Sequence, residues 1–311
     1  ADRTIVLPAA LPAARELIVQ EDLDVLFYPD IGMDPLTYFL AFSRLAPVQC
    51  VTWGHPDTTG IPAIDYFVSS EHLEPEGADL HYTERLVRLA QLPTYYYRPD
   101  VPPGLKTRAD FSLEEERVIY LCPQSLFKLH PDFDEFVAGV LRAHPQGQAV
   151  FIEGQFKHFT ELIMRRFRKT IPDVLDRIRV LPRQNSRDFI SLLSVVDVIL
   201  DPVKWSGGST TYEALSFGTP IVTMPSEFMR GRVTYACYKQ MGVLDCVAST
   251  KEEYVKLAVR LGTDAAYRAK VKARLLAANA ILYENGEAVR ELERFFETAV
   301  GNTRCAAVEE S

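Results

Sequence analysis

Short apolar runs alternate with amphipathic segments throughout the second half of the chain. Strands are predicted at 118–122, 149–153, 178–181, 198–201 and 221–224. Helices are predicted near 132–143, 159–168, 187–195, 211–217 and 232–241. Apolar runs of roughly four to eight residues are typical of buried strands, and strands that alternate with helices predict a parallel, doubly wound sheet. This half therefore predicts a Rossmann-like α/β domain.

The first hundred residues follow a less regular pattern. Strands are predicted at 4–8, 23–28, 48–53, 65–69 and 84–89, and helices at 9–20 and 36–45. The segment Arg98–Gly104 holds three prolines and a glycine, which predict a linker or hinge. The residues from Lys251 onward are amphipathic and predict helices, the last of them at 287–300. We therefore divide the chain into domains at 1–104 and 105–300, with a disordered tail expected at 301–311.

Composition and charge narrow the class of protein. The chain has 311 residues, 47% of them hydrophobic, and a formal net charge of -8. Its length suits two domains with ordinary cores, and its negative charge argues against a nucleic-acid partner. No apolar run reaches the roughly 20 residues of a membrane span, so no membrane partner is expected. Five widely spaced cysteines without a CxxC indicate reduced thiols in the cytoplasm or nucleus. The chain opens on Ala1 rather than Met, which suggests a fragment.

The strongest candidate for chemistry is Trp205–Thr211, which we call the 205–211 turn. It joins a predicted strand to a predicted helix. Free amides and the dipole at a helix N-terminus favour phosphate, and glycine allows close approach of the backbone. Its candidate binding residues are Gly208, Ser209, Thr210 and Thr211, and Glu213 in the first helical turn can accept from ribose hydroxyls. The alternative is an ordinary turn with a Ser/Thr helix cap.

Three further loops carry candidates. Gln124 and Lys128 follow the first strand of the second domain, where a lysine can neutralise a diphosphate, although most lysines are simply exposed. The segment Gly54–Gly60, which we call the 54–60 loop, holds His55, a candidate base or hydrogen-bonding group or else a turn histidine. Gln184 lies in a loop whose backbone can contact a flat base edge, with helix capping as the alternative.

Metal and cofactor chemistry find little support in the sequence. Asp132 and Asp134 form a DxD that opens a predicted helix, so capping explains them better than metal binding. The remaining histidines lack metal-ligand spacing. No GxSxG, Walker A or GxGxxG motif occurs, which argues against hydrolase, P-loop and dinucleotide-binding classes. We expect no metal and no cofactor.

Together these motifs resemble the catalytic region of the O-linked N-acetylglucosamine transferase and SPINDLY family, glycosyltransferases of the GT-B type. The similar stretches keep their order along the chain and are 24–33, 45–49, 53–60, 65–66, 124–128, 197–201, 208–211 and 218–225, followed by Arg232. The resemblance implies a GT-B fold of two Rossmann-like domains, the first incomplete here. It also implies tetratricopeptide repeats upstream in the full-length protein.

The resemblance further implies an inverting, metal-independent transfer from a nucleotide sugar, first UDP-N-acetylglucosamine, to Ser or Thr of acceptor proteins. In this family the diphosphate would be held at Lys128, Thr210 and Thr211, and the ribose near Glu213. The donor sugar would face Gly54 and His55. A backbone contact to the base would fall near Gln184. Lys128 and His55 are thus the expected catalytic residues.

Three positions depart from the animal enzymes. Ser209 stands where they carry a histidine, Phe189 where another histidine stacks near the base, and His55 where they carry a tyrosine. These departures are similar to the bacterial and SPINDLY-like branches, so UDP-glucose and GDP-fucose stay open as donors. Two other classes stay open as well: a non-catalytic nucleotide-sugar-binding or interaction module, and another GT-B enzyme.

Overall fold

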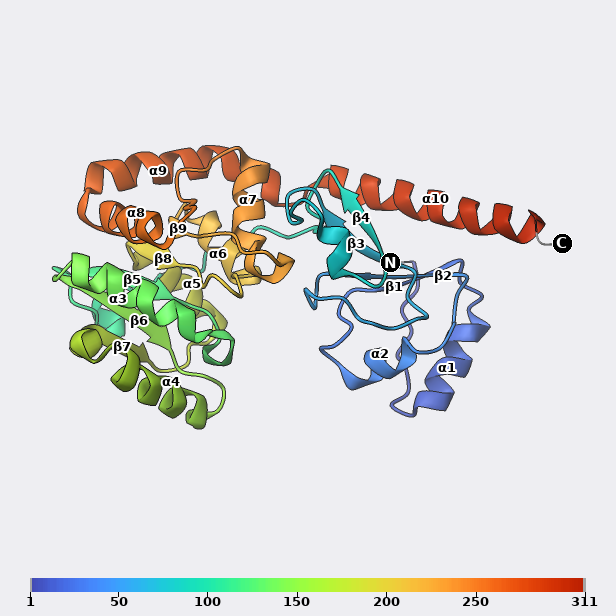
Figure 1. The fold of residues 1–311 in the computed structure, drawn as a ribbon, viewed down its shortest axis with the longest axis horizontal. Coiled ribbons are helices and arrows are strands. Elements are labelled where there is room, and N and C mark those ends of the chain that lie inside the picture. Colours follow the sequence, from blue (N-terminus) through green and yellow to red (C-terminus); the bar gives the residue numbers. More distant parts are fainter. Residues whose placement is uncertain (1, 310–311) are drawn as a thin grey trace. The chain divides into compact units, whose positions relative to one another are not determined.

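The computed structural model describes residues 2–309, with side chains as far as Thr303, as two compact units. The first unit comprises residues up to Tyr95 together with those from Asn285, and the second comprises Tyr96–Glu284 (Figure 1). The predicted boundary after residue 104 is therefore displaced. The predicted linker Arg98–Gly104 belongs to the second unit, where the Arg98 guanidinium donates to Asn279.

The first unit is built on a four-stranded parallel sheet of order β1-β2-β3-β4. Its strands are β1 (Val25–Tyr28), β2 (Val48–Thr52), β3 (Tyr66–Ser70) and β4 (Arg85–Leu89), and its early helices are α1 (Leu11–Gln20) and α2 (Pro35–Leu40). The strand predicted at 4–8 is wrong, since those residues pair with no strand. Val6 in that run is 89% exposed, so its apolar character finds no partner to bury it.

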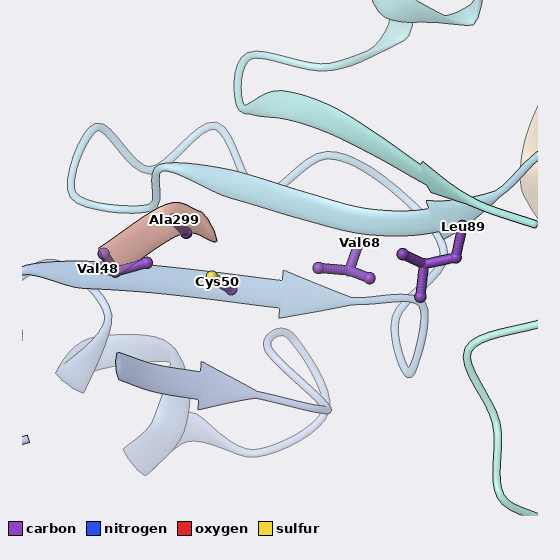
Figure 2. Packing of buried hydrophobic residues seen from close by; sticks show 5 residues of the cluster. All are labelled: Val48, Cys50, Val68, Leu89 and Ala299. Atoms are coloured by element: carbon purple, nitrogen blue, oxygen red, sulfur yellow. The ribbon is translucent and has the colours of Figure 1, made fainter. Parts of the chain in front are cut away.

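The last helix, α10 (Gly286–Glu309), packs on this first sheet. Figure 2 shows Ala299 of the helix beside Val48, Cys50, Val68 and Leu89 of the strands. The rings of Phe27 and Phe296 add a contact at 5.4 Å, and those of Tyr66 and Phe295 one at 5.3 Å. The chain thus returns to its first unit, which local sequence patterns do not reveal. The tail expected to be disordered is corrected as well: residues 301–309 are helical, and 310–311 lie outside the described residues.

The second unit confirms the predicted strand–helix alternation. Its strands are β5 (Val118–Cys122), β6 (Gly147–Ile152), β7 (Ile178–Leu181), β8 (Val198–Leu200) and β9 (Ile221–Val222). Its helices are α3 (Asp134–Ala143), α4 (Lys157–Thr170), α5 (Ser186–Val195), α6 (Ser209–Ser216), α7 (Val233–Met241), α8 (Lys251–Thr263) and α9 (Ala265–Ala278). All pairings are parallel, and the strand order is β7-β6-β5-β8-β9.

This strand order places a topological switch point between β5 and β8. From β5 the chain first builds outward through β6 and β7, and then returns to add β8 and β9 on the other side. In open α/β sheets, ligands bind outside the carboxyl ends of the strands at such a point. The central strand β5 is buried along most of its length, as a sheet covered on both faces requires. Among the described residues, no helix is both long enough and apolar enough to cross a bilayer.

Candidate functional site

An open pocket of about 450 Å³ lies at the carboxyl ends of β5, β6 and β7 and beside the start of α6. Residues that follow each of these strands line it, among them Gln124, Gly154 and Gln184, and Thr210 contributes from α6. Pockets of roughly 300–1,000 Å³ are typical of small-molecule sites. The pocket therefore has the size and the place that the switch point predicts.

The 205–211 turn brings the N-terminus of α6 to this pocket. Gly208 is the N-cap, so Ser209 and Thr210 open the helix, where the first amides have no partner within the helix. A methyl group built on Gly208 would meet nothing within 4 Å, whereas one on Gly207 would lie 2.7 Å from the Thr211 hydroxyl. Gly208 thus leaves open space beside the free amides, and Gly207 allows tight packing of the turn. This geometry suits an anion.

A buried hydrogen-bond network holds the turn from below. We call it the Asp201 network; its members are Asp201, Ser206, Gly207, Thr211, Thr223 and Thr234. The Thr211 hydroxyl lies 2.8 Å from that of Thr234 and 3.1 Å from the carbonyl oxygen of Gly207. Thr211 is buried, so its hydroxyl points into the protein rather than into the pocket. Of the two threonines, Thr210 is the one that lines the pocket.

Gln124 and Lys128 meet the same turn from the loop after β5. The Gln124 side-chain amide donates to the carbonyl oxygens of Trp205 and Ser206, both at 3.1 Å. The Lys128 ammonium lies 4.7 Å from the centroid of the Trp205 ring. Burial lowers the pKa of Lys128, because a half-buried ammonium loses hydration. The structure thus brings together the lysine and the turn that the sequence singled out separately.

Aromatic side chains form a wall of the pocket that sequence analysis missed. Phe127, Phe156, Phe159 and Phe189 all line it. The rings of Phe127 and Phe159 are 5.6 Å apart, and those of Phe156 and Phe159 are 6.1 Å apart. Phe127 and Phe156 are 64% and 55% exposed, so their faces are available to stack on a flat ring. Their position just after β5 and β6 was the signal that could have identified them.

Gln184 and Glu213 have different surroundings. Gln184 lines the pocket, and its amide donates to the carbonyl oxygen of Pro182 at 2.5 Å. Its neighbour Asn185 caps α5, as the alternative interpretation of this loop held. Glu213 is not among the described residues that line the pocket, and burial raises the pKa of its carboxyl. Its expected contact with ribose stays a prediction.

The 54–60 loop follows β2 in the first unit. A methyl group on Gly54 would lie 1.9 Å from the carbonyl oxygen of Pro29, and one on Gly32 would lie 3.0 Å from the His55 ring. Thr58 donates to the buried Glu84 at 2.6 Å, and Thr59 donates to it through both its amide and its hydroxyl. The expected roles of Gly54 and His55 beside a donor sugar stay predictions.

The DxD segment is structural at its second aspartate. Asp134 is buried and binds the Arg166 guanidinium through both carboxylate oxygens, at 2.8 and 3.0 Å. It also accepts from the Thr170 hydroxyl at 2.7 Å. Its carboxylate therefore joins α3 to α4. Within residues 2–309, no three His, Cys, Asp or Glu side chains are placed to hold a metal ion together.

Sequence comparisons place this chain among known proteins. The profile of glycosyl transferase family 41 matches residues 99–285. A probable UDP-N-acetylglucosamine–peptide N-acetylglucosaminyltransferase SPINDLY from Hordeum vulgare is 32% identical over 71% of this chain and 23% of that protein. A UDP-glucose:protein N-beta-glucosyltransferase from Actinobacillus pleuropneumoniae is 25% identical over 83% of this chain and 41% of that protein. The chain thus spans less than half the length of either relative.

Solved structures agree on the fold. A mutant of the Thermobaculum terrenum O-GlcNAc transferase is similar at a TM-score of 0.83 and 28% identity, over 97% of this chain and 58% of that one. An E. coli structure described as trehalose-6-phosphate bound with UDP-2-fluoro glucose reaches a TM-score of 0.56 at 12% identity, a likeness of fold alone. These similarities confirm the predicted α/β class of GT-B type with Rossmann-like units.

Proposed function

This chain belongs to glycosyl transferase family 41, and from that premise we propose that its second unit binds a nucleotide sugar whose sugar is transferred to a protein. One observation carries the proposal. Gln124, Lys128 and the N-terminus of α6 converge beside one pocket at the switch point of the second sheet. Free amides, a helix dipole and an ammonium together suit a diphosphate better than a neutral ligand.

The pocket divides naturally into two ends in this proposal. The diphosphate lies against the amides of Ser209 and Thr210, with the Lys128 ammonium beside it. The nucleoside extends toward the aromatic wall, where Phe127 and Phe156 present exposed ring faces to a base. Gln184 lines that end and can contact a base edge.

The reaction follows from this placement. An acceptor hydroxyl attacks the anomeric carbon of the donor from the face opposite the diphosphate, so the new C–O bond forms as the bond to the diphosphate breaks, with inversion. Lys128 and the amides of α6 stabilise the charge that develops on the departing diphosphate. The acceptor proton passes to a base or to solvent, and His55 is the candidate within this chain.

The donor and acceptor are inferred from the relatives. The SPINDLY protein is named for UDP-N-acetylglucosamine and a peptide acceptor, and the Actinobacillus enzyme for UDP-glucose and a protein acceptor. We propose UDP-N-acetylglucosamine as donor and Ser or Thr of proteins as acceptor, without a metal. UDP-glucose is the second candidate, supported by the Actinobacillus relative, and GDP-fucose the third.

Ligand binding tests the proposal directly. UDP and its sugars should raise the thermal unfolding midpoint of this chain, since a ligand that binds only the folded state stabilises it. GDP and GDP-fucose are the matched comparison, and a larger shift with them would replace the donor. If no nucleotide shifts the midpoint, the proposal is wrong. If UDP binds but the full-length protein transfers no labelled sugar to protein, the chain is a binding module.

A further inference from the structure

Asp201 lies at the carboxyl end of β8, only 4% exposed, and no part of the proposed reaction uses it. It forms no ion pair with any described residue, so hydrogen bonds alone satisfy its carboxyl group. An unpaired buried carboxylate is costly unless its oxygens are well hydrogen-bonded. The arrangement of its donors therefore indicates a specific task.

We propose that Asp201 is the positioning residue of the donor site: it sets the 205–211 turn so that the first amides of α6 face the pocket. This inference rests on the proposed function. One carboxylate oxygen accepts from the amide of Gly207 at 2.8 Å. The other accepts from the hydroxyls of Ser206 at 2.7 Å and Thr223 at 2.8 Å. Two of these three donors belong to the turn itself.

The hydroxyl groups of the network have a definite order when Asp201 is ionised. The single proton of Ser206 goes to the carboxylate, so the Ser206 oxygen accepts from the amide and hydroxyl of Thr234, at 3.0 and 2.9 Å. The hydroxyl of Thr211 then donates to Thr234 or to the carbonyl oxygen of Gly207. The hydroxyls of the network thus lead toward Asp201 from α6 and α7.

The network decides which backbone amides are left for a ligand. The amide of Gly207 is directed inward to Asp201, and that of Thr211 donates to the carbonyl oxygen of Gly208. The amides of the three residues between them are those that the turn presents at the start of the helix. The Tyr254 hydroxyl donates to the backbone carbonyl of Asp201 at 3.1 Å and so fixes the base of this arrangement.

A matched pair of variants separates positioning from simple stabilisation. Ser206→Ala and Thr223→Val each remove one hydroxyl that donates to the same oxygen of Asp201, at nearly equal distances. Both should lower the unfolding midpoint. Ser206→Ala should also weaken the binding of UDP, or of GDP if the wild type prefers it, by about tenfold, because it frees the turn. Thr223→Val, on β9's side, should leave affinity unchanged. Equal effects of the two variants on affinity would overturn the proposal.

Substitutions at Asp201 give a second test. Asp201→Leu should lose nucleotide affinity by at least about tenfold. Asp201→Asn should restore most of it, because its amide oxygen still accepts from Gly207 while the hydroxyls reverse their order to accept from its NH₂ group. Calorimetry measures both affinities. A folded Asp201→Leu variant with wild-type affinity would contradict a positioning role.

Hydrogen exchange keeps the test independent of the ligand. If the wild type binds neither UDP nor GDP, the proposed function fails, but the positioning of the turn can still be measured. Amides of residues 206–210 should exchange faster in Ser206→Ala than in Thr223→Val, since local opening sets exchange rates. Equal exchange in the two variants would overturn the positioning role even if Asp201→Leu does not fold.

Discussion

The two units each carry a glycine- and threonine-containing segment after a parallel strand, and each segment is held by a buried acid. In the first unit, Glu84 holds Thr58 and Thr59 of the 54–60 loop. In the second unit, Asp201 holds the 205–211 turn through Ser206 and Gly207. Composition therefore does not distinguish the two segments, whereas the next element along the chain does.

The 205–211 turn runs directly into the eight-residue helix α6, whereas no helix starts within the 54–60 loop. Only the turn therefore has a set of aligned free amides and a helix dipole. The hydroxyls also differ. Glu84 takes up both threonine hydroxyls of the loop, while Thr210 of the turn still lines a pocket. A similar pattern of residues thus produces a closed loop in one unit and an anion site in the other.

The two acids also differ in their pKa. Burial works to raise the pKa of Glu84, but hydrogen bonds from Thr58 and Thr59 outweigh it and hold the pKa below 4.5. At Asp201 burial prevails over the hydrogen bonds from Ser206, Gly207 and Thr223, and the pKa is raised. Ionised Glu84 therefore adds to stability, whereas ionising Asp201 costs stability as the pH rises through its folded pKa.

The largest expected effect tests whether the second unit alone holds the diphosphate. Lys128→Ala should lower sugar transfer by the full-length protein about 100-fold or more, because it removes charge stabilisation of the leaving group. Lys204→Ala is the control, since that side chain is 53% exposed and should change transfer by no more than about threefold. The unfolding midpoints should stay close to wild type. Unchanged turnover in Lys128→Ala would remove this lysine from the mechanism.

A pair of glycine substitutions should separate packing from ligand binding. Gly54→Ala places a methyl group 1.9 Å from a backbone oxygen and should destabilise the first unit by about 1–3 kcal/mol. Gly208→Ala meets nothing within 4 Å, so it should change thermal unfolding little but lower UDP affinity by filling the space beside the amides. Calorimetric unfolding and titration measure the two effects. A destabilised Gly208→Ala with normal affinity would reverse the comparison.

The two threonines of the turn should also separate. Thr211→Val removes a buried hydroxyl from the Asp201 network and should cost about 1–3 kcal/mol of unfolding free energy. Thr210→Val should leave stability within about 0.5 kcal/mol, since such changes at partly exposed sites are small, and should weaken UDP binding several-fold. Denaturant unfolding and calorimetry decide. Equal stability losses would show that both hydroxyls serve packing.

The smallest expected effect concerns pH. Glu84→Gln should lower stability by about 1 kcal/mol near neutral pH, because it removes the charge to which Thr58 and Thr59 donate. Since the pKa of Glu84 is lowered when folded, the gap to wild type should be full above pH 4.5 and close as the pH falls through the folded value. Unfolding midpoints across pH test this, with exposed Glu115→Gln as the control. A gap that widens in acid would contradict the assignment.

The sequence by itself determined the second unit's architecture and most of its site. Alternating apolar runs and helical segments predicted a parallel doubly wound sheet, because each apolar segment must be buried and each crossover needs a helix. Lys128 and the 205–211 turn could be singled out from their places after strands, since ligands bind at those ends. Local pattern and local chemistry agree in this region.

Only the tertiary structure decided which side chains face the ligand and where the chain ends pack. Thr210 and Thr211 are adjacent and chemically identical, yet the helix turns one toward the pocket and the other toward Thr234. The return of α10 to the first sheet depends on contacts between residues more than two hundred positions apart, such as Val48 and Ala299. Sequence periodicity records which face is apolar, but not which distant surface will cover it.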